Sequence, residues 1–218
     1  MDYIVWHINE SEEELRAELQ HPEYFAEKVA SLKPGSRRML EVLAVRRAMK
    51  ELFYGEEQRV GYDEEGRPRL IGDRHDMSSR LGDKGLPRLP YISISHTTDY
   101  AAVIASEHPV GIDIERRGKR VACVVSHFLK PDEVARLSLL AGEEEERLSL
   151  FLHLAWSAKE AAFKVLGRAY YDLQRLTTIT MLSAQSRQIM LAVEGRQQPM
   201  TLHFDYTEDY VLVWCEDK

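Results

Sequence analysis

The sequence predicts an α+β protein made of two halves, each with its own strands and helices. Segments of alternating apolar and polar residues, typical of half-buried strands, occur at the start, in the middle and at the end of the chain. Segments of helical periodicity separate them. The order strand, helices, strands therefore occurs twice, which predicts halves 1–107 and 108–218 with segregated sheets and helices.

The first half is predicted to begin with a strand over 3–8. Ser11 and Glu14 have the spacing of a capping box, which starts a short helix. Ser36 caps a longer helix that continues to about Phe53. The remaining predictions are an edge strand at 67–71, a mobile insertion loop at 72–90 rich in Gly, Asp, Ser and Pro, and strands at 91–95 and 100–106.

The second half is predicted to open with a strand at 110–115. Pro131, followed by two acidic residues, favours a helix start at that position. The predicted helices lie around 121–129, 131–140 and 143–166, and the closing strands at 176–182, 188–194, 200–206 and 210–215.

Composition is that of a water-soluble globular protein. No apolar run approaches the roughly 18 residues of a membrane span, so we expect no membrane insertion. The N-terminus lacks the basic and apolar regions of a signal peptide, and Cys123 and Cys215 are far apart. We expect two buried, reduced thiols and a cytoplasmic protein.

The formal net charge of −7 argues against binding to nucleic acid or to acidic membranes. Basic residues are nevertheless clustered. The pattern fits either solvated faces or local handling of an anion. The two clusters are Arg37, Arg38, Arg46 and Arg47, and Arg116, Arg117, Lys119 and Arg120.

The segment Gly111–Glu115 is the first candidate site. Alternation along a strand directs Ile112 and Ile114 to the core and places Asp113 and Glu115 on the other face. Two neighbouring carboxylates repel unless solvent or a cation lies between them, and Mg²⁺ takes such ligands. Gly111 would leave room for a ligand. The alternative is an edge strand with a polar outer face.

The segment Trp156–Lys164 is the second candidate site. Trp156, Glu160 and Lys164 fall on one stripe of a predicted helix. Lys159 lies about 100° around the helix from Glu160, near enough to address the same ligand. The alternative is a surface Glu–Lys pair contributing only about 0.3–0.5 kcal/mol. The many apolar neighbours indicate a helix buried on most sides, which favours function.

The strand end at Ser95 and His96 is the third candidate site. Its hydroxyls, imidazole and backbone N–H groups could bind a phosphate. A Ser/His nucleophilic pair is the alternative. It is disfavoured because adjacent side chains at a strand end point apart and no Gly-x-Ser-x-Gly elbow is present.

Together these segments resemble the 4′-phosphopantetheinyl transferases of the Sfp type over about residues 36–170. The matching elements occur in the family's order. They are Gly66-Arg67-Pro68, Ser95-His96, Gly111–Glu115, Phe128–Glu133 and Trp156–Lys164 with Gly167.

The resemblance implies a pseudo-twofold pair of similar α+β halves with coenzyme A in the cleft between them, and we expect a monomer. It implies a Mg²⁺-dependent reaction in which a carrier-protein serine attacks the β-phosphate of coenzyme A and 3′,5′-ADP leaves. The acceptor would be an apo carrier protein of the acyl, polyketide or peptidyl type.

The resemblance also implies roles for single residues. Asp113, Glu115 and Glu160 would hold Mg²⁺. Lys159 and Lys164 would face the pyrophosphate, and Glu160 would be the base, directly or through a metal-bound water. The donor would be held by Ser95, His96 and Arg38 at the 3′-phosphate, and by Arg67 near the adenine and its phosphates.

Two other functions remain open alternatives. A non-catalytic module that binds coenzyme A or a nucleotide would not need the three carboxylates. A metal-dependent phosphohydrolase would not need the lysine pair. If transfer is correct, Arg116, Arg117, Lys119 and Arg120 would attract an acidic carrier. Val124, Val125, Phe128 and Leu129 would contact it.

Overall fold

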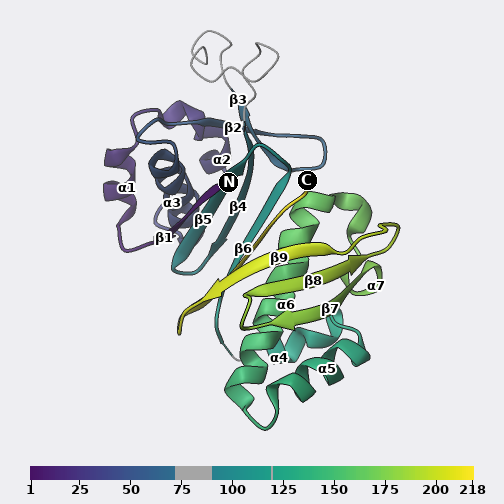
Figure 1. Cartoon of the computed structure of the whole chain (residues 1–218). Helices are drawn as coiled ribbons and strands as arrows, with labels where there is room; N and C mark the ends of the chain where they lie inside the picture. The colour runs from purple at the N-terminus through teal and green to yellow at the C-terminus, as the bar shows by residue number, and fades with distance from the viewer. Residues whose placement is uncertain (72–89, 119) are drawn as a thin grey trace. The chain divides into compact units, whose positions relative to one another are not determined.

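The computed structural model describes residues 1–71, 90–118 and 120–218 (Figure 1). The chain divides into two compact units, which we call the N-terminal unit (Met1–Val110 with Lys218) and the C-terminal unit (Gly111–Asp217). Each contains its own sheet and helices, so the predicted α+β class is confirmed. The predicted loop at 72–90 falls almost wholly outside the described residues, and the pseudo-twofold relation remains a prediction.

The N-terminal unit is built on a three-stranded antiparallel sheet of order β1-β5-β4. Its strands are β1 Asp2–His7, β5 Tyr100–Ser106 and β4 Tyr91–Thr97. A separate hairpin pairs β2 Arg59–Tyr62 with β3 Pro68–Ile71. Strand β2 was not predicted, because Gly61 interrupts an already short segment.

Helix α3 (Arg37–Leu52) supplies most of the helical core of this unit. Its N-cap is the predicted Ser36, whose hydroxyl accepts a hydrogen bond from the Met39 amide at 3.2 Å. Leu43 and Ala48 are fully buried with residues of β5. The shorter helices are α1 Glu12–Glu18, which has the predicted Ser11–Glu14 capping box, α2 Ala26–Ala30 and the 3₁₀ turn η1 Pro22–Tyr24.

The C-terminal unit is built on a five-stranded sheet of order β6-β10-β9-β8-β7. Strand β6 (Val110–Arg116) and strand β7 (Thr177–Ser183) are therefore its two edges. The other strands are β8 Gln188–Val193, β9 Met200–Tyr206 and β10 Tyr210–Glu216.

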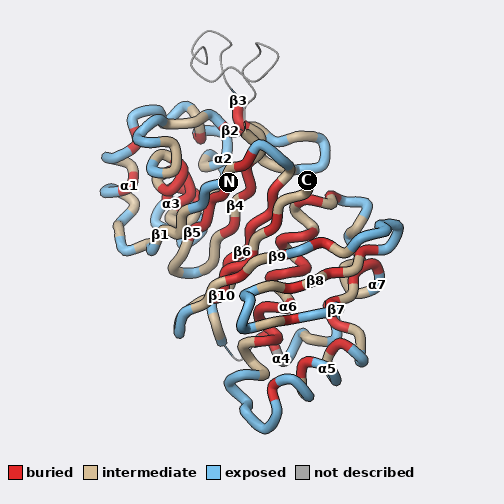
Figure 2. The backbone as a smooth tube through the Cα atoms, viewed as in Figure 1, coloured by how far each residue is buried: buried red, intermediate tan, exposed pale blue. Residues whose placement is uncertain are grey.

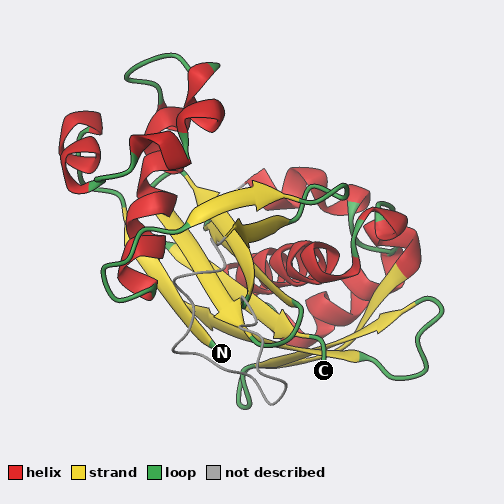
Figure 3. Ribbon diagram, turned by 90° about the horizontal axis from the view of Figure 1, so that it is seen from above, coloured by secondary structure: helices red, strands yellow, loops and turns green. Residues whose placement is uncertain are grey.

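Helix α6 (Glu145–Leu166) is the longest helix of the described chain and packs on this sheet (Figure 3). Much of its length is buried, as predicted (Figure 2). The other elements are α4 Arg120–Val124, η2 Val125–His127, α5 Pro131–Ala141, η3 Arg168–Tyr170 and α7 Leu173–Leu176.

Two general expectations can be compared with this structure. Both cysteines are free, but only Cys215 is buried, and Cys123 is exposed against expectation. Within the described ranges, no helix combines the length and apolar character needed to cross a membrane.

Candidate functional site

Strand β6 and helix α6 lie in direct backbone contact at Gly111. A Cβ atom at this position would fall 2.0 Å from the carbonyl oxygen of Ala161 and 3.0 Å from a methyl of Val165. The expectation that Gly111 leaves room for a ligand is therefore wrong. The glycine is required because the helix occupies that space, and this contact brings the carboxylates of β6 to the helix stripe.

Asp113 and Lys164 form the ion pair of this contact. Lys164 Nζ lies 2.9 Å from Asp113 Oδ1 and donates to the Ile112 carbonyl at 2.7 Å. The Asp113 side chain is 6% exposed, whereas that of Lys164 is 25% exposed. The lysine therefore bridges the strand and the helix while part of its side chain remains exposed to solvent.

Glu115 and Trp156 form the next contact along the strand. The Trp156 indole N–H donates to Glu115 Oε1 at 3.1 Å. Glu115 and Glu160 are both half-buried. The structure thus brings together the residues predicted on β6 and on the helix stripe. We call Asp113, Glu115, Glu160 and Lys164 the carboxylate–lysine cluster.

The carboxylates of this cluster influence one another. Burial, and then the charge of Asp113, raises the pKa of Glu115 to about 7, and Glu160 adds to the effect. Burial and Asp113 also raise the pKa of Glu160, while Lys164 opposes the shift. Negative charge is crowded here beyond what one lysine neutralises.

The cluster has the donor chemistry of a hard divalent cation. Mutually repelling carboxylate oxygens are the ligands that Mg²⁺ accepts, together with substrate phosphates and water. Within the described ranges, however, no group of three or more His, Cys, Asp or Glu side chains is arranged as a metal site. The side chains of Asp113, Glu115 and Glu160 are of the type that Mg²⁺ binds. In this structure, however, Asp113 is paired with Lys164.

Lys159 lies in a different place from the one expected. Its side chain is 0% exposed and its Nζ lies 3.0 Å from Glu133 Oε2, also 0% exposed. The ammonium also donates to the carbonyls of Thr177 and Leu173, at 3.2 and 3.4 Å. Burial lowers the pKa of Lys159, and Glu133 opposes that shift. The expectation that Lys159 faces a pyrophosphate is therefore corrected.

The N-terminal unit brings His96 and Arg38 together. Arg38 Nη1 contacts the His96 ring, and Glu41 Oε2 lies 3.2 Å from both Arg38 Nη1 and His96 Nδ1. Ser95 is 7% exposed on β4. Arg67 is held instead by Asp63 and Glu65, at 3.1 and 3.0 Å.

The surface expected to receive a carrier is only partly available. Phe128 and Leu129 are each 1% exposed and belong to the core of the C-terminal unit, so they cannot contact a partner. Val124 is 40% exposed and Arg116 is also exposed. Lys119 lies outside the described residues.

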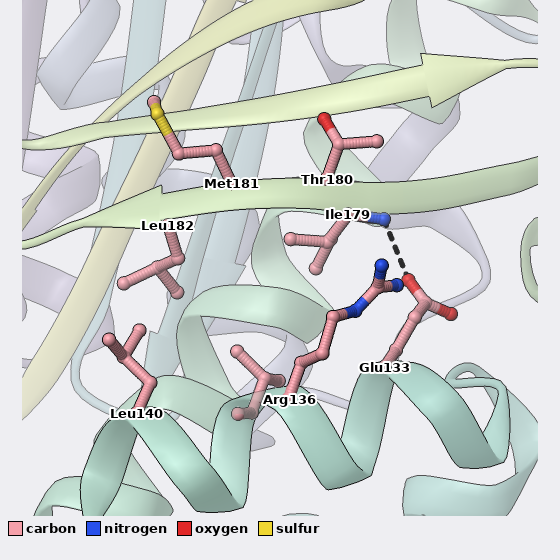
Figure 4. A pocket seen from close by; sticks show the side chains of 8 residues that line it. Glu133, Arg136, Leu140, Ile179, Thr180, Met181 and Leu182 are labelled. Atoms are coloured by element: carbon pink, nitrogen blue, oxygen red, sulfur yellow. Dashed lines mark hydrogen bonds between the residues drawn. The ribbon is translucent and has the colours of Figure 1, made fainter.

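A cavity of about 240 Å³ opens between helix α5 and strand β7 (Figure 4). It is lined mainly by apolar side chains, with Glu133 and Arg136 at the helix side. None of the predicted site residues lines it. The sequence placed Glu133 in an acidic first turn and in the matching segment Phe128–Glu133, but it gave no sign of the buried lysine opposite.

Comparison with known proteins places this cluster in a family context. Residues 109–215 match the family model of the 4′-phosphopantetheinyl transferase superfamily. A 4′-phosphopantetheinyl transferase of Bacillus subtilis is 25% identical over 137 residues, covering 62% of this chain and 59% of the relative. The 4′-phosphopantetheinyl transferase gsp of Aneurinibacillus migulanus is 26% identical over 113 residues, which cover 52% of this chain and 45% of the relative.

A third relative carries a different name. Enterobactin synthase component D of Escherichia coli (strain K12) is 29% identical over 136 residues, 60% of each chain. The chain thus spans only about half to three fifths of the length of these relatives.

Proposed function

We propose that this chain transfers the phosphopantetheine arm of coenzyme A to a carrier-protein serine, because residues 109–215 match the family model of the 4′-phosphopantetheinyl transferase superfamily. The observation that carries the proposal is the carboxylate–lysine cluster. Asp113 and Glu115 come from β6, and Glu160 and Lys164 come from α6. Both elements lie inside the matched segment.

The proposed reaction is a phosphoryl transfer. The serine oxygen forms a bond to the β-phosphorus of coenzyme A, the pyrophosphate bond breaks, and 3′,5′-ADP leaves. Asp113, Glu115 and Glu160 would hold Mg²⁺, which when bound neutralises charge on the phosphate oxygens.

The chain's own side chains supply the remaining parts. Lys164 would exchange Asp113 for a phosphate oxygen, since its side chain is 25% exposed whereas that of Lys159 is fully buried. Glu160 would take the serine proton, directly or through a bound water. In the N-terminal unit, Arg38, Ser95 and His96 would hold the 3′-phosphate of the donor, and Arg67 its adenine side.

The acceptor is proposed to be an apo carrier protein. By the family resemblance such carriers are usually acidic, and the exposed Arg116 and the exposed Val124 would offer them a positive and an apolar contact. The acyl, polyketide and peptidyl types are the proposed classes of acceptor.

Intact-protein mass spectrometry tests the proposal. Apo carriers of the three types are incubated with coenzyme A, Mg²⁺ and the full chain. We expect at least one carrier to gain a single phosphopantetheine, and the same carrier with its acceptor serine replaced by alanine to remain unmodified. Asp113→Asn should abolish the gain, while the exposed Asp132→Asn should preserve it.

Failure has two distinguishable forms. Cleavage of coenzyme A without any carrier modification would favour a phosphohydrolase. Tight coenzyme A binding with neither cleavage nor transfer would favour a binding module.

A further inference from the structure

The pair Lys159–Glu133 joins four segments of the C-terminal unit. Lys159 comes from α6, Glu133 from the first turn of α5, and the carbonyls bound by the lysine lie at Leu173 and Thr177. The three hydrogens of the ammonium group thus have three acceptors within 3.4 Å.

Glu133 is equally committed. Its Oε1 accepts the amide of Ile179 on strand β7 at 2.7 Å, and its Oε2 also accepts the amide of Lys130 at 2.9 Å. Both side chains are 0% exposed, although Glu133 also lines the cavity between α5 and β7. Such a pair fixes geometry strongly, because any displacement leaves a buried charge without compensation.

The position of Lys159 on α6 gives this anchor its consequence. Lys159 immediately precedes Glu160, and Lys164 lies little more than a turn further along the helix. Side chains of adjacent helical residues leave the axis about 100° apart, so holding Lys159 sets the direction of Glu160 toward β6. A helix rotated or shifted at Lys159 would misplace both members of the cluster that α6 carries.

We propose that Lys159 is a positioning residue: paired with Glu133, it fixes the rotation of α6 and thereby aims Glu160 and Lys164 at Asp113. This inference rests on the proposed transferase function for its kinetic readout only. Lys159 itself touches no substrate in this account.

The test uses Lys159→Met, Glu133→Gln and the double variant K159M/E133Q in the full chain. Lysine removal alone leaves the Glu133 charge buried, whereas the double variant removes both charges and keeps an acceptor for the Ile179 amide. Neutral replacements of a buried pair are often tolerated, although breaking one is not. Lys130→Met is the matched control, since Lys130 is bound to Thr178 Oγ1 at 2.8 Å but belongs to no ion pair in the described residues.

Two readouts are measured beside the melting temperature. The first is kcat and KM for carrier modification, where we expect Lys159→Met to lower kcat about a hundredfold, as for a slightly misplaced catalytic group, with a smaller change in KM. The second is Trp156 fluorescence in a Trp6→Phe, Trp214→Phe background, because the Trp156 indole is bound to Glu115 across the cluster. We expect Lys159→Met to shift this emission, and the double variant to restore both emission and most of kcat.

The inference is overturned if K159M/E133Q regains the melting temperature and Trp156 emission but stays as slow as Lys159→Met, since Lys159 would then act on substrate. It is also overturned if Lys159→Met leaves the emission unchanged. Should Lys159→Met fail to fold, the double variant decides alone: parent-like kcat and emission support positioning. An inactive parent would refute the proposed function instead, and the Trp156 emission would still test the anchor.

Discussion

Helix α6 carries two lysine–carboxylate pairs that differ in access to solvent. Lys159 and Glu133 are both 0% exposed, and every polar atom of the pair is bound within the protein. The side chain of Lys164 is 25% exposed, and its partner Asp113 lies close enough to Glu115 to raise the pKa of that carboxyl. The same chemical pair thus occurs once as a sealed anchor and once as an open contact that a ligand can rearrange.

This difference teaches where function resides on the helix. Both residues of a buried ion pair can be replaced together by neutral ones, but a ligand cannot take the place of either partner. Under the proposed function, the open pair would give up its lysine to a phosphate oxygen and its carboxylate to a cation. Residue type and helical spacing alone do not separate the two.

The largest expected effect is that of Lys164→Met. Loss of a cation that stabilises charge in the transition state should lower kcat/KM for carrier modification by about 10²- to 10³-fold. The melting temperature should fall less than for Lys159→Met, because Lys164 is partly solvated. A parent-like rate for Lys164→Met would remove the distinction between the pairs.

The next largest effect is a loss of stability in Gly111→Ala. This substitution should push β6 away from α6 and leave the Lys159–Glu133 pair unchanged. Its methyl would collide with the Ala161 carbonyl, so unfolding by urea should show a loss of about 1–3 kcal/mol. Gly118→Ala is the matched control, since nothing lies within 4 Å of the added atom. Equal stability of both variants would mean that the β6–α6 contact is looser than described.

The smallest effect is expected from His96→Ala in the N-terminal unit. If His96 binds the 3′-phosphate, the variant should lose about tenfold in affinity for coenzyme A, as for one hydrogen bond to a charged group. Dephospho-coenzyme A should be little affected. Calorimetry that shows equal losses for both ligands would assign His96 to the ion network with Arg38 and Glu41 instead.

Most of the fold could be predicted from the sequence because local signals dominate it. The Ser11 and Ser36 caps, the proline at the start of α5 and the alternation in the closing strands each act over a few residues. Strand β2 was missed because its four residues carry too short a pattern.

The site was predicted in part, and the errors share one cause. Alternation placed Asp113 and Glu115 correctly on one face, but it could not show that a helix, with Ala161 against Gly111, covers that face. Periodicity likewise indicated that α6 is buried without showing that Glu133, from a distant segment, faces Lys159. Which element covers a given face depends on contacts between distant segments, and local patterns do not reveal them. For the same reason, Phe128 and Leu129 were wrongly predicted to contact a carrier at the surface.

Titration of the full chain with Mn²⁺, followed by electron paramagnetic resonance, tests the central claim most directly. The open pair should mark the cation site, so the parent and K159M/E133Q should bind Mn²⁺ alike. Asp113→Asn should weaken binding by more than roughly tenfold, since loss of even an outer partner of a metal ligand costs that much. Asp132→Asn, whose side chain is 65% exposed, should bind as the parent does. Parent-like Mn²⁺ binding by Asp113→Asn would contradict the account.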